Sequence, residues 1–146
     1  MKDVELLICD DASEDGTQEF LKNIYSEHTL IFNKESKGLI FNRNILNNLA
    51  KGKYIISLDD DANFLSNKPL NYIEDFFLNH PKCAVISFRV FWGLNKPIKM
   101  NSKENSYIVN SFLGCGHVWR KEYWNKIPNY PSWFIFYGEE SFASFH

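Results

Sequence analysis

Residues 51–61 read Lys-Gly-Lys-Tyr-Ile-Ile-Ser-Leu-Asp-Asp-Asp, and this stretch decides the fold expected of the chain. Residues 54–58 form a short, mostly apolar run, which is the pattern of a strand buried on both faces of a parallel sheet. The run stops at three consecutive aspartates. Open α/β sheets bind their ligands at the carboxyl ends of their strands, so we expect these aspartates at a ligand-binding edge.

The three aspartates predict a site for a divalent metal. Adjacent carboxylates repel one another, and burial disfavours their charged forms unless a cation is present. Asp59 and Asp61 therefore indicate a site for a metal ion that also holds phosphate oxygens. A solvated acidic turn after a strand explains the same residues equally well, because short acidic clusters are common where loops begin.

Composition narrows the class of protein. The chain has 146 residues, enough for one domain with a core of its own, and its 45% hydrophobic content is that of a globular protein. A net charge of −2 gives no electrostatic support for general binding to nucleic acid. No apolar run approaches the ~20 residues that span a bilayer. The cysteines are odd in number and without a CxxC pair, which indicates reduced thiols in a cytosolic setting: Cys9, Cys83 and Cys115.

Strand and helix patterns alternate along the chain. Helices are expected after Asp15, with Phe20, Leu21 and Ile24 as the buried face, and again at residues 38–50 and 70–78. Residues 91–105 predict a loop. Apolar runs predict strands at residues 4–8, 30–32, 54–58, 83–88 and 107–113. This alternation predicts an α/β fold, with a Rossmann-like, mostly parallel sheet and helices on both faces.

One charged residue lies on an apolar helix stripe. In the helix of residues 38–50, Leu39, Arg43, Leu46 and Ala50 share the face that should meet the sheet. The stem of Arg43 could cover apolar surface while its guanidinium reaches water. Alternatively, the guanidinium points to the ligand edge, where acids and phosphates collect.

Four short stretches together resemble the motifs of one enzyme family. Residues 7–17 read LICDDASEDGT, similar to a VVDDGSTDGT motif, and residues 42–54 contain Asn-Arg-Asn followed by Leu-Ala-Lys-Gly-Lys-Tyr, as in ARN…LAKGEY. Residues 58–61 match a metal-binding DxD motif, and residues 136–140, Phe-Tyr-Gly-Glu-Glu, resemble a YGED segment that supplies a catalytic base. On these stretches the chain resembles the nucleotide-sugar-binding half of a family 2 glycosyltransferase of the GT-A fold.

The resemblance implies a function and a set of roles. It implies an inverting transfer of a sugar from a nucleotide-diphospho-sugar, expected to be a UDP-sugar, to a hydroxyl of a glycan, lipid-linked or protein acceptor, as in polysaccharide biosynthesis. Asp11 would accept the ring N–H of a uracil-type base, with Asp10 behind it holding the loop. Arg43 would face the nucleotide, which favours the second account of that side chain, and Asp60 would reach the ribose hydroxyls.

Further roles concern the metal and the acceptor side. The resemblance implies that Asp59 and Asp61 hold Mn²⁺ or Mg²⁺, which bridges the diphosphate and stabilises it as a leaving group. Glu140 would be the general base that deprotonates the acceptor hydroxyl, with Glu139 beside it in the pocket. The turn Gly114-Cys115-Gly116 would let the donor sugar approach the backbone, although a plain turn is an equally good interpretation.

The chain also departs from the family pattern. The family's domain opens with a central strand carrying an SVIIPTYN motif, whereas this chain begins at what would be the second strand. We therefore expect one partial domain lacking the usual first strand. Residues 1–90 would form its nucleotide-sugar-binding part, and residues 91–146 the start of the acceptor part. Glu140 stands where many members have Asp.

Two other functions fit part of the pattern. A receiver-like domain also has an acidic pair after one strand and a phosphoacceptor aspartate after another, but it would leave the Glu-Glu segment unexplained. A non-catalytic nucleotide-binding remnant fits the missing strand. For the transferase we expect a cytoplasmic location, with the inner face of the membrane as the alternative for a full-length form.

Overall fold

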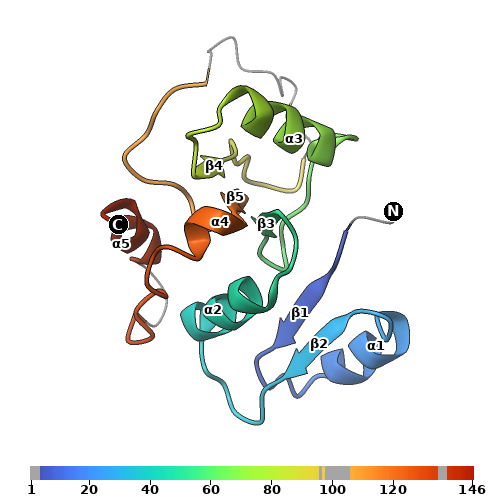
Figure 1. The fold of residues 1–146 in the computed structure, drawn as a ribbon. Coiled ribbons are helices and arrows are strands. Elements are labelled where there is room, and N and C mark those ends of the chain that lie inside the picture. The colour runs from blue at the N-terminus through green and yellow to red at the C-terminus, as the bar shows by residue number, and fades with distance from the viewer. Residues whose placement is uncertain (1–3, 96, 98–105, 135–137) are drawn as a thin grey trace.

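The computed structural model describes residues 4–95, 97, 106–134 and 138–146. Short apolar runs flanked by polar loops form strands here, and amphipathic runs form helices. Figure 1 shows how these elements are arranged. In chain order the elements are β1 Leu7–Asp10, α1 Thr17–Ile24, β2 Thr29–Phe32, α2 Leu39–Leu49, β3 Tyr54–Ser57, α3 Pro69–Asn79, β4 Val85–Ser87, β5 His117–Arg120, α4 Lys121–Trp124 and α5 Glu139–Ser144.

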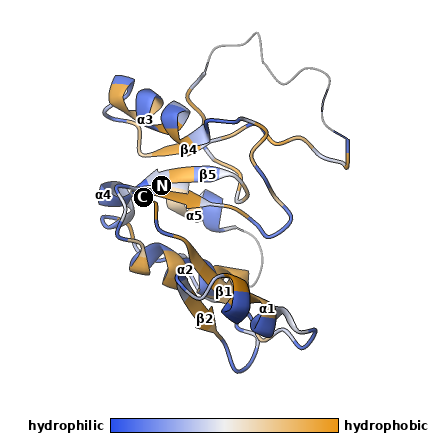
Figure 2. Ribbon diagram, turned by 90° about the vertical axis from the view of Figure 1, so that its right-hand side faces the viewer, coloured by the Kyte–Doolittle hydropathy of each residue, from blue (hydrophilic) through white to orange (hydrophobic). Residues whose placement is uncertain are grey.

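The strands form two sheets. β1 and β2 pair in parallel, with Leu7 opposite Thr29, and Figure 2 shows both strands as predominantly apolar. The second sheet has the order β3-β5-β4, and β5 runs antiparallel to both of its neighbours. The α/β class is confirmed, with β5 as the exception to the parallel arrangement. When the chain leaves one strand and starts the neighbouring strand at the same end of the sheet, the two strands run antiparallel.

Helices cover both faces of the second sheet, as the sequence predicts. In β5, Val118 packs in one cluster with Ile73 and Phe77 of α3, while Trp119 packs in another with Ile40 of α2. Successive strand residues point to opposite faces, so α3 and α2 lie on opposite sides of the sheet. Each cluster removes apolar surface from water, which is the main driving force for this packing.

No backbone ladder joins β1 to β3 in the part of the chain that the structure describes. The Glu5 carboxylate bridges the two regions by accepting hydrogen bonds from the backbone N–H groups of Lys51, at 2.5 Å, and Gly52, at 2.7 Å. Among the described helices, none is long and apolar enough to cross a membrane.

Two expectations about apolar runs are wrong. Residues 107–113 form no strand, and Ile108 is 98% exposed. An apolar run forms a strand only where a neighbouring backbone offers hydrogen-bond partners. In this sheet β5 takes the position between β3 and β4. On α1, Leu21 is buried but Phe20 and Ile24 are exposed, because this helix packs against a sheet of only two strands. The loop predicted for residues 91–105 lies partly outside the described residues.

Candidate active site

The acidic loop follows β3 as expected from the sequence. Asp59 is partly buried, with 34% of its side chain exposed, whereas Asp60 and Asp61 are exposed. The backbone carbonyl of Asp59 accepts a hydrogen bond from the N–H of Ala62 at 3.1 Å, which turns the chain sharply after the strand. The turn leaves the carboxylate of Asp61 at the surface, where it is open to solvent and to a cation.

Arg43 of α2 reaches this loop from inside the protein. Its side chain is 5% exposed, so the account in which its guanidinium extends into water is wrong. Nη2 donates to Oδ1 of Asp59 at 2.9 Å, and Nη1 donates to Oε1 of Glu139 at 2.6 Å. Charge-assisted hydrogen bonds of this kind are roughly twice as strong as neutral ones, so Arg43 ties α5 to the acidic loop.

The two glutamates at the start of α5 differ in their surroundings. Gly138 precedes them with φ of 110°, a left-handed conformation that a side chain would strain. Glu139 is 2% exposed, and its Oε2 has no hydrogen-bond partner among the described residues. Burial raises the pKa of Glu139, and the Arg43 guanidinium acts against that rise. Glu140 is only partly buried, so its carboxylate is the accessible one of the pair.

Gly114 lies against both glutamates. A Cβ at this position would lie 2.6 Å from Oε1 of Glu140, 3.1 Å from Nη1 of Arg43 and 3.3 Å from Oε1 of Glu139. Any side chain at residue 114 would therefore displace the carboxylates. The structure thus brings together four residues that the sequence analysis placed in a site, and the close approach explains why the position is a glycine.

The rest of this turn faces the acidic loop. Burial raises the pKa of the Cys115 thiol, and the neighbouring carboxylates of Asp59 and Asp61 add to the rise. Gly116, with φ of 70°, donates its N–H to the Ser57 carbonyl at 3.1 Å. The turn is therefore joined to β3 directly ahead of the aspartates.

The acidic pair after β1 has a different setting. Asp10 is buried and its Oδ1 accepts hydrogen bonds from the backbone N–H of Ser13, at 3.1 Å, and from Nε2 of Gln18, at 2.8 Å. Burial alone would raise the pKa of Asp10, but the hydrogen bonds from Ser13 and Gln18 hold it below its ordinary value. Asp10 holds the loop between β1 and α1.

Asp11 holds the loop between β2 and α2. Its carboxylate accepts four hydrogen bonds, from Nδ2 of Asn33 at 2.8 Å, Oγ of Ser36 at 2.7 Å, and the backbone N–H groups of Lys37 at 2.7 Å and Gly38 at 2.9 Å. Burial opposes ionisation, but hydrogen bonds, including those from loop residues 33–37, lower the pKa of Asp11 well below its ordinary value. Both carboxylate oxygens of Asp11 are therefore engaged by the protein itself. A contact between Asp11 and a nucleobase stays a prediction.

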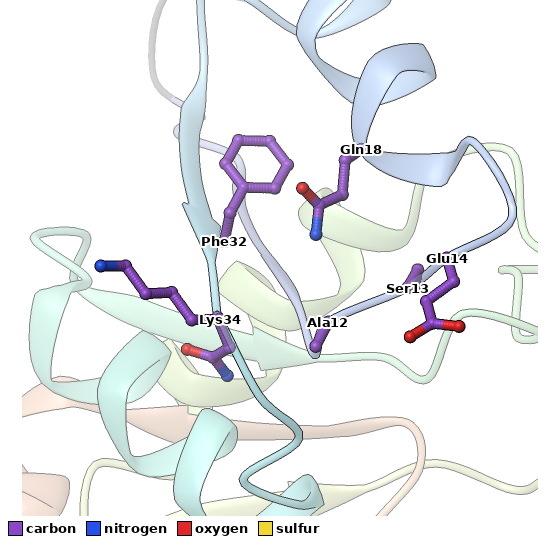
Figure 3. A pocket seen from close by; sticks show the side chains of 7 residues that line it. Ala12, Ser13, Glu14, Gln18, Phe32 and Lys34 are labelled. Atoms are coloured by element: carbon purple, nitrogen blue, oxygen red, sulfur yellow. The ribbon is translucent and has the colours of Figure 1, made fainter.

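A hollow of about 400 Å³ opens beside this pair, between α1 and the end of β2 (Figure 3). Ala12 stands at its base with φ of 67°, the left-handed conformation, at the position where the family motif has glycine. The Phe32 ring and the Gln18 amide face each other across it. The lining is Ala12, Ser13, Glu14, Gln18, Phe32, Asn33 and Lys34.

The predicted metal site has carboxylate oxygens as its donors. Across the described residues, no group of three or more His, Cys, Asp and Glu side chains has the geometry to hold a metal ion. Asp59 and Asp61 supply two carboxylates, which suits Mn²⁺ or Mg²⁺, since Mg²⁺ is usually bound by one or two carboxylates with water and substrate phosphates completing the shell. The donor set fits such an ion.

Comparison with known proteins identifies the family. The whole chain, residues 1–146, matches the family model described as glycosyl transferase family 2. The chain belongs to this family. Membership removes the receiver-domain alternative.

One curated relative is UDP-Glc:alpha-D-GlcNAc-diphosphoundecaprenol beta-1,3-glucosyltransferase WfaP of Escherichia coli. It is 37% identical over 73 residues, which are 49% of this chain and 29% of the relative. Among solved structures, S. aureus TarS 1–349 in complex with UDP has a TM-score of 0.71 at 20% identity, covering 98% of this chain and 45% of that one. S. aureus TarS has a TM-score of 0.74 at 18% identity, covering 98% and 27%. The chain thus spans less than half the length of each of these proteins. The likeness to the TarS structures confirms the GT-A fold.

Some residues of the site were missed by sequence reasoning. Asn33 and Ser36, which hold Asp11, lie in a polar run that reads as an ordinary loop. His117 is fully buried next to Gly114, although the sequence around it gives no sign of this role. No local pattern distinguishes these three from other polar residues. Residues 136 and 137 of the YGED-like segment lie outside the described residues.

Proposed function

We propose that the protein is an inverting glycosyltransferase that moves a sugar from a UDP-sugar to an acceptor hydroxyl in a metal-dependent reaction. The observation that carries the proposal is the convergence of Arg43, Glu139 and Glu140 on Gly114. The same guanidinium holds Asp59 of the acidic loop at 2.9 Å. Two relatives support the donor class, because WfaP is a UDP-Glc-dependent glucosyltransferase and S. aureus TarS has been solved in complex with UDP.

The donor would bind across the carboxyl ends of β1 and β3. Asp60 is exposed next to Asp59 and would accept hydrogen bonds from the ribose hydroxyls. The loop ends held by Asp10 and Asp11 would bound the nucleobase, and Arg43 would stand behind the diphosphate. Because Asp10, Asp11 and Arg43 are already fixed by hydrogen bonds, this part of the site is organised before a ligand arrives.

Asp59 and Asp61 would hold Mn²⁺ or Mg²⁺. When bound, the ion neutralises charge on the diphosphate and so makes UDP a better leaving group. Nη2 of Arg43 donates to Oδ1 of Asp59 at 2.9 Å, which fixes the orientation of that carboxylate, and Asp59 would bind the ion in this orientation. Asp61 needs no rearrangement of buried structure to join it, since its side chain is exposed.

Glu140 would act on the acceptor. Its partly exposed carboxylate takes the proton from the acceptor hydroxyl while that oxygen forms the new bond to the anomeric carbon and the bond to the diphosphate oxygen breaks. A single displacement from the opposite face inverts the configuration. Glu139 is unsuited to this step, because it is 2% exposed and hydrogen-bonded to Arg43.

Calorimetry with UDP tests the donor site. We expect UDP to bind more tightly with Mn²⁺ than without it, and Asp61→Ala to abolish that difference. Asp75→Ala is the matched control, since Asp75 is an exposed aspartate on α3. Equal UDP affinity with and without Mn²⁺ in the unmutated protein would refute the assignment of the metal site.

Turnover of the full-length protein tests the base. A general base contributes ~10²–10⁴-fold, so Glu140→Gln should reduce kcat by about that factor while UDP affinity stays within about threefold. Glu122→Gln, an exposed change on α4, is the control. If Glu140→Gln kept normal turnover and Glu139→Gln did not, Glu139 would be the base. If neither slowed transfer, the segment would have no catalytic role.

A binding role without turnover is the second candidate. The absence of a ladder between β1 and β3 in the described residues favours it, because the ligand edge then spans two separate sheets. Metal-dependent binding of UDP, together with no detectable transfer by the full-length protein, would support this candidate over the enzyme.

A further inference from the structure

The turn between Leu113 and His117 is held at both of its ends. At one end the Leu113 N–H donates to Oγ of Ser87 at 3.1 Å, and at the other the Gly116 carbonyl accepts from the Phe88 N–H at 2.9 Å. His117 closes the turn from inside: its Nδ1 lies 2.7 Å from the Gly114 carbonyl oxygen and 3.1 Å from that of Leu113. Both partners are acceptors, so Nδ1 carries the hydrogen.

The surroundings of His117 favour the neutral imidazole. It is fully buried, and its ring centroid lies 4.8 Å from that of Phe112. Burial and the nearby Arg43 guanidinium lower the pKa of His117 to about 3. Its Nε2 has no hydrogen-bond partner among the described residues. Near neutral pH the imidazole is therefore uncharged, with one tautomer selected by the turn.

The residue that His117 holds is the one that meets the glutamate pair. The Gly114 Cα faces Oε1 of Glu140 so closely that a Cβ would lie 2.6 Å from it. Glu140 itself lies in the first turn of a short helix, and its carboxylate is close enough to that of Glu139 to raise the pKa of Glu139. The position of the Gly114 backbone therefore limits where the Glu140 carboxylate can go.

We propose that His117 is a positioning residue for Glu140: by donating to the Gly114 and Leu113 carbonyls, it fixes the backbone surface against which the Glu140 carboxylate rests. The inference depends on the proposed function for its kinetic consequence, because Glu140 is the base there. The structural claim, that the imidazole determines the position of the Glu140 carboxylate, can be tested without measuring turnover.

Two substitutions separate the hydrogen bond from the volume of the ring. His117→Phe keeps a ring beside Phe112 and removes the donor, whereas His117→Asn keeps a donor close to the position of Nδ1. In the full-length protein we expect His117→Phe to lower kcat on the order of 10²-fold, as misplacement by about 1 Å does, with the KM for the donor within about threefold. His117→Asn should restore most of kcat.

A matched control exists on the other side of the sheet. Nδ1 of His80 also lies 2.8 Å from a carbonyl four residues earlier, that of Phe76, but His80 is exposed and at the end of α3. His80→Phe should leave kcat unchanged. Equal kcat in His117→Phe and the unmutated protein, or equal losses in His117→Phe and His117→Asn, would overturn the proposal.

A readout that needs no turnover keeps the two claims apart. In protein with ¹³C-labelled glutamate, the Glu140 carboxyl resonance is assigned through its loss in Glu140→Gln. We expect this resonance to move in His117→Phe and to stay in place in His80→Phe. Gly114→Ala, which inserts the clashing Cβ, should move it too, and it serves if His117→Phe does not fold. If the Glu140 resonance does not move in His117→Phe, the inference is overturned. If the unmutated protein transfers no sugar, only the proposed function is contradicted.

Discussion

Replacing Arg43 with methionine should destabilise the protein strongly. The change removes both hydrogen bonds of the guanidinium and leaves Glu139, which is 2% exposed, as a buried carboxylate without its partner. Removing one member of a buried ion pair costs about 3–5 kcal/mol. The Asp59 half of the bridge adds little, because 34% of that side chain is exposed and surface pairs contribute about 0–1 kcal/mol.

A double-mutant cycle separates the ion pair from the loss of packing. Glu139→Gln removes the stranded charge, so Arg43→Met combined with Glu139→Gln should be less destabilised than the sum of the single changes. For groups in direct contact we expect a coupling free energy of about 1–3 kcal/mol. A destabilisation of 3–5 kcal/mol corresponds to a fall in Tm of roughly 6–20 °C for a chain of about this size.

Urea unfolding followed by tryptophan fluorescence is the assay, because Trp119 and Trp124 are 3% and 2% exposed and report loss of the core. Arg89→Met is the control, since Arg89 is exposed and its guanidinium lies over the Phe91 ring. That change should stay within about 0.5 kcal/mol of the unmutated protein. A cost below about 1 kcal/mol for Arg43→Met, or additive single changes, would refute the view that Arg43 balances a buried charge on Glu139.

Three further outcomes are expected. Because the pKa of His117 falls from its ordinary 6.5 to about 3 on folding, the unfolded chain takes up a proton first as the pH drops, and stability should be lost below pH 6.5 by up to about 1.4 kcal/mol per pH unit. His117→Asn should flatten the stability profile between about pH 4.5 and 6, and an unchanged slope would contradict the assignment. Asp11→Asn should cost about 1–3 kcal/mol in urea unfolding, since the 33–38 loop loses its charged acceptor, and a neutral result would show that the loop holds itself. The edges of β1 and β3 that carry no ladder among the described residues should make the 146-residue chain self-associate in sedimentation experiments as concentration rises, whereas a monomer with a cooperative high-temperature melt would contradict this.

Local patterns were sufficient for much of the fold. The apolar run at residues 54–58 and its three aspartates predicted β3 and the loop after it, and the positions of α2 and α3 followed from helical periodicity. These features depend on residues within a few positions of one another, which is the range over which side-chain periodicity acts. The same holds for the family motifs, which the match over residues 1–146 confirms as a family assignment.

Contacts between distant residues decided the rest. The run at residues 107–113 has the composition of a strand but lies exposed, because the order β3-β5-β4 gives the central place to β5. No periodicity predicts that Arg43 meets Glu139, or that His117 supports Gly114, since each pair is chosen by how separate elements pack. Burial then determines the charge state and partners of these side chains. Arg43, removed from water, pairs with two carboxylates, and buried His117 stays neutral. Both side chains are buried only in the folded chain.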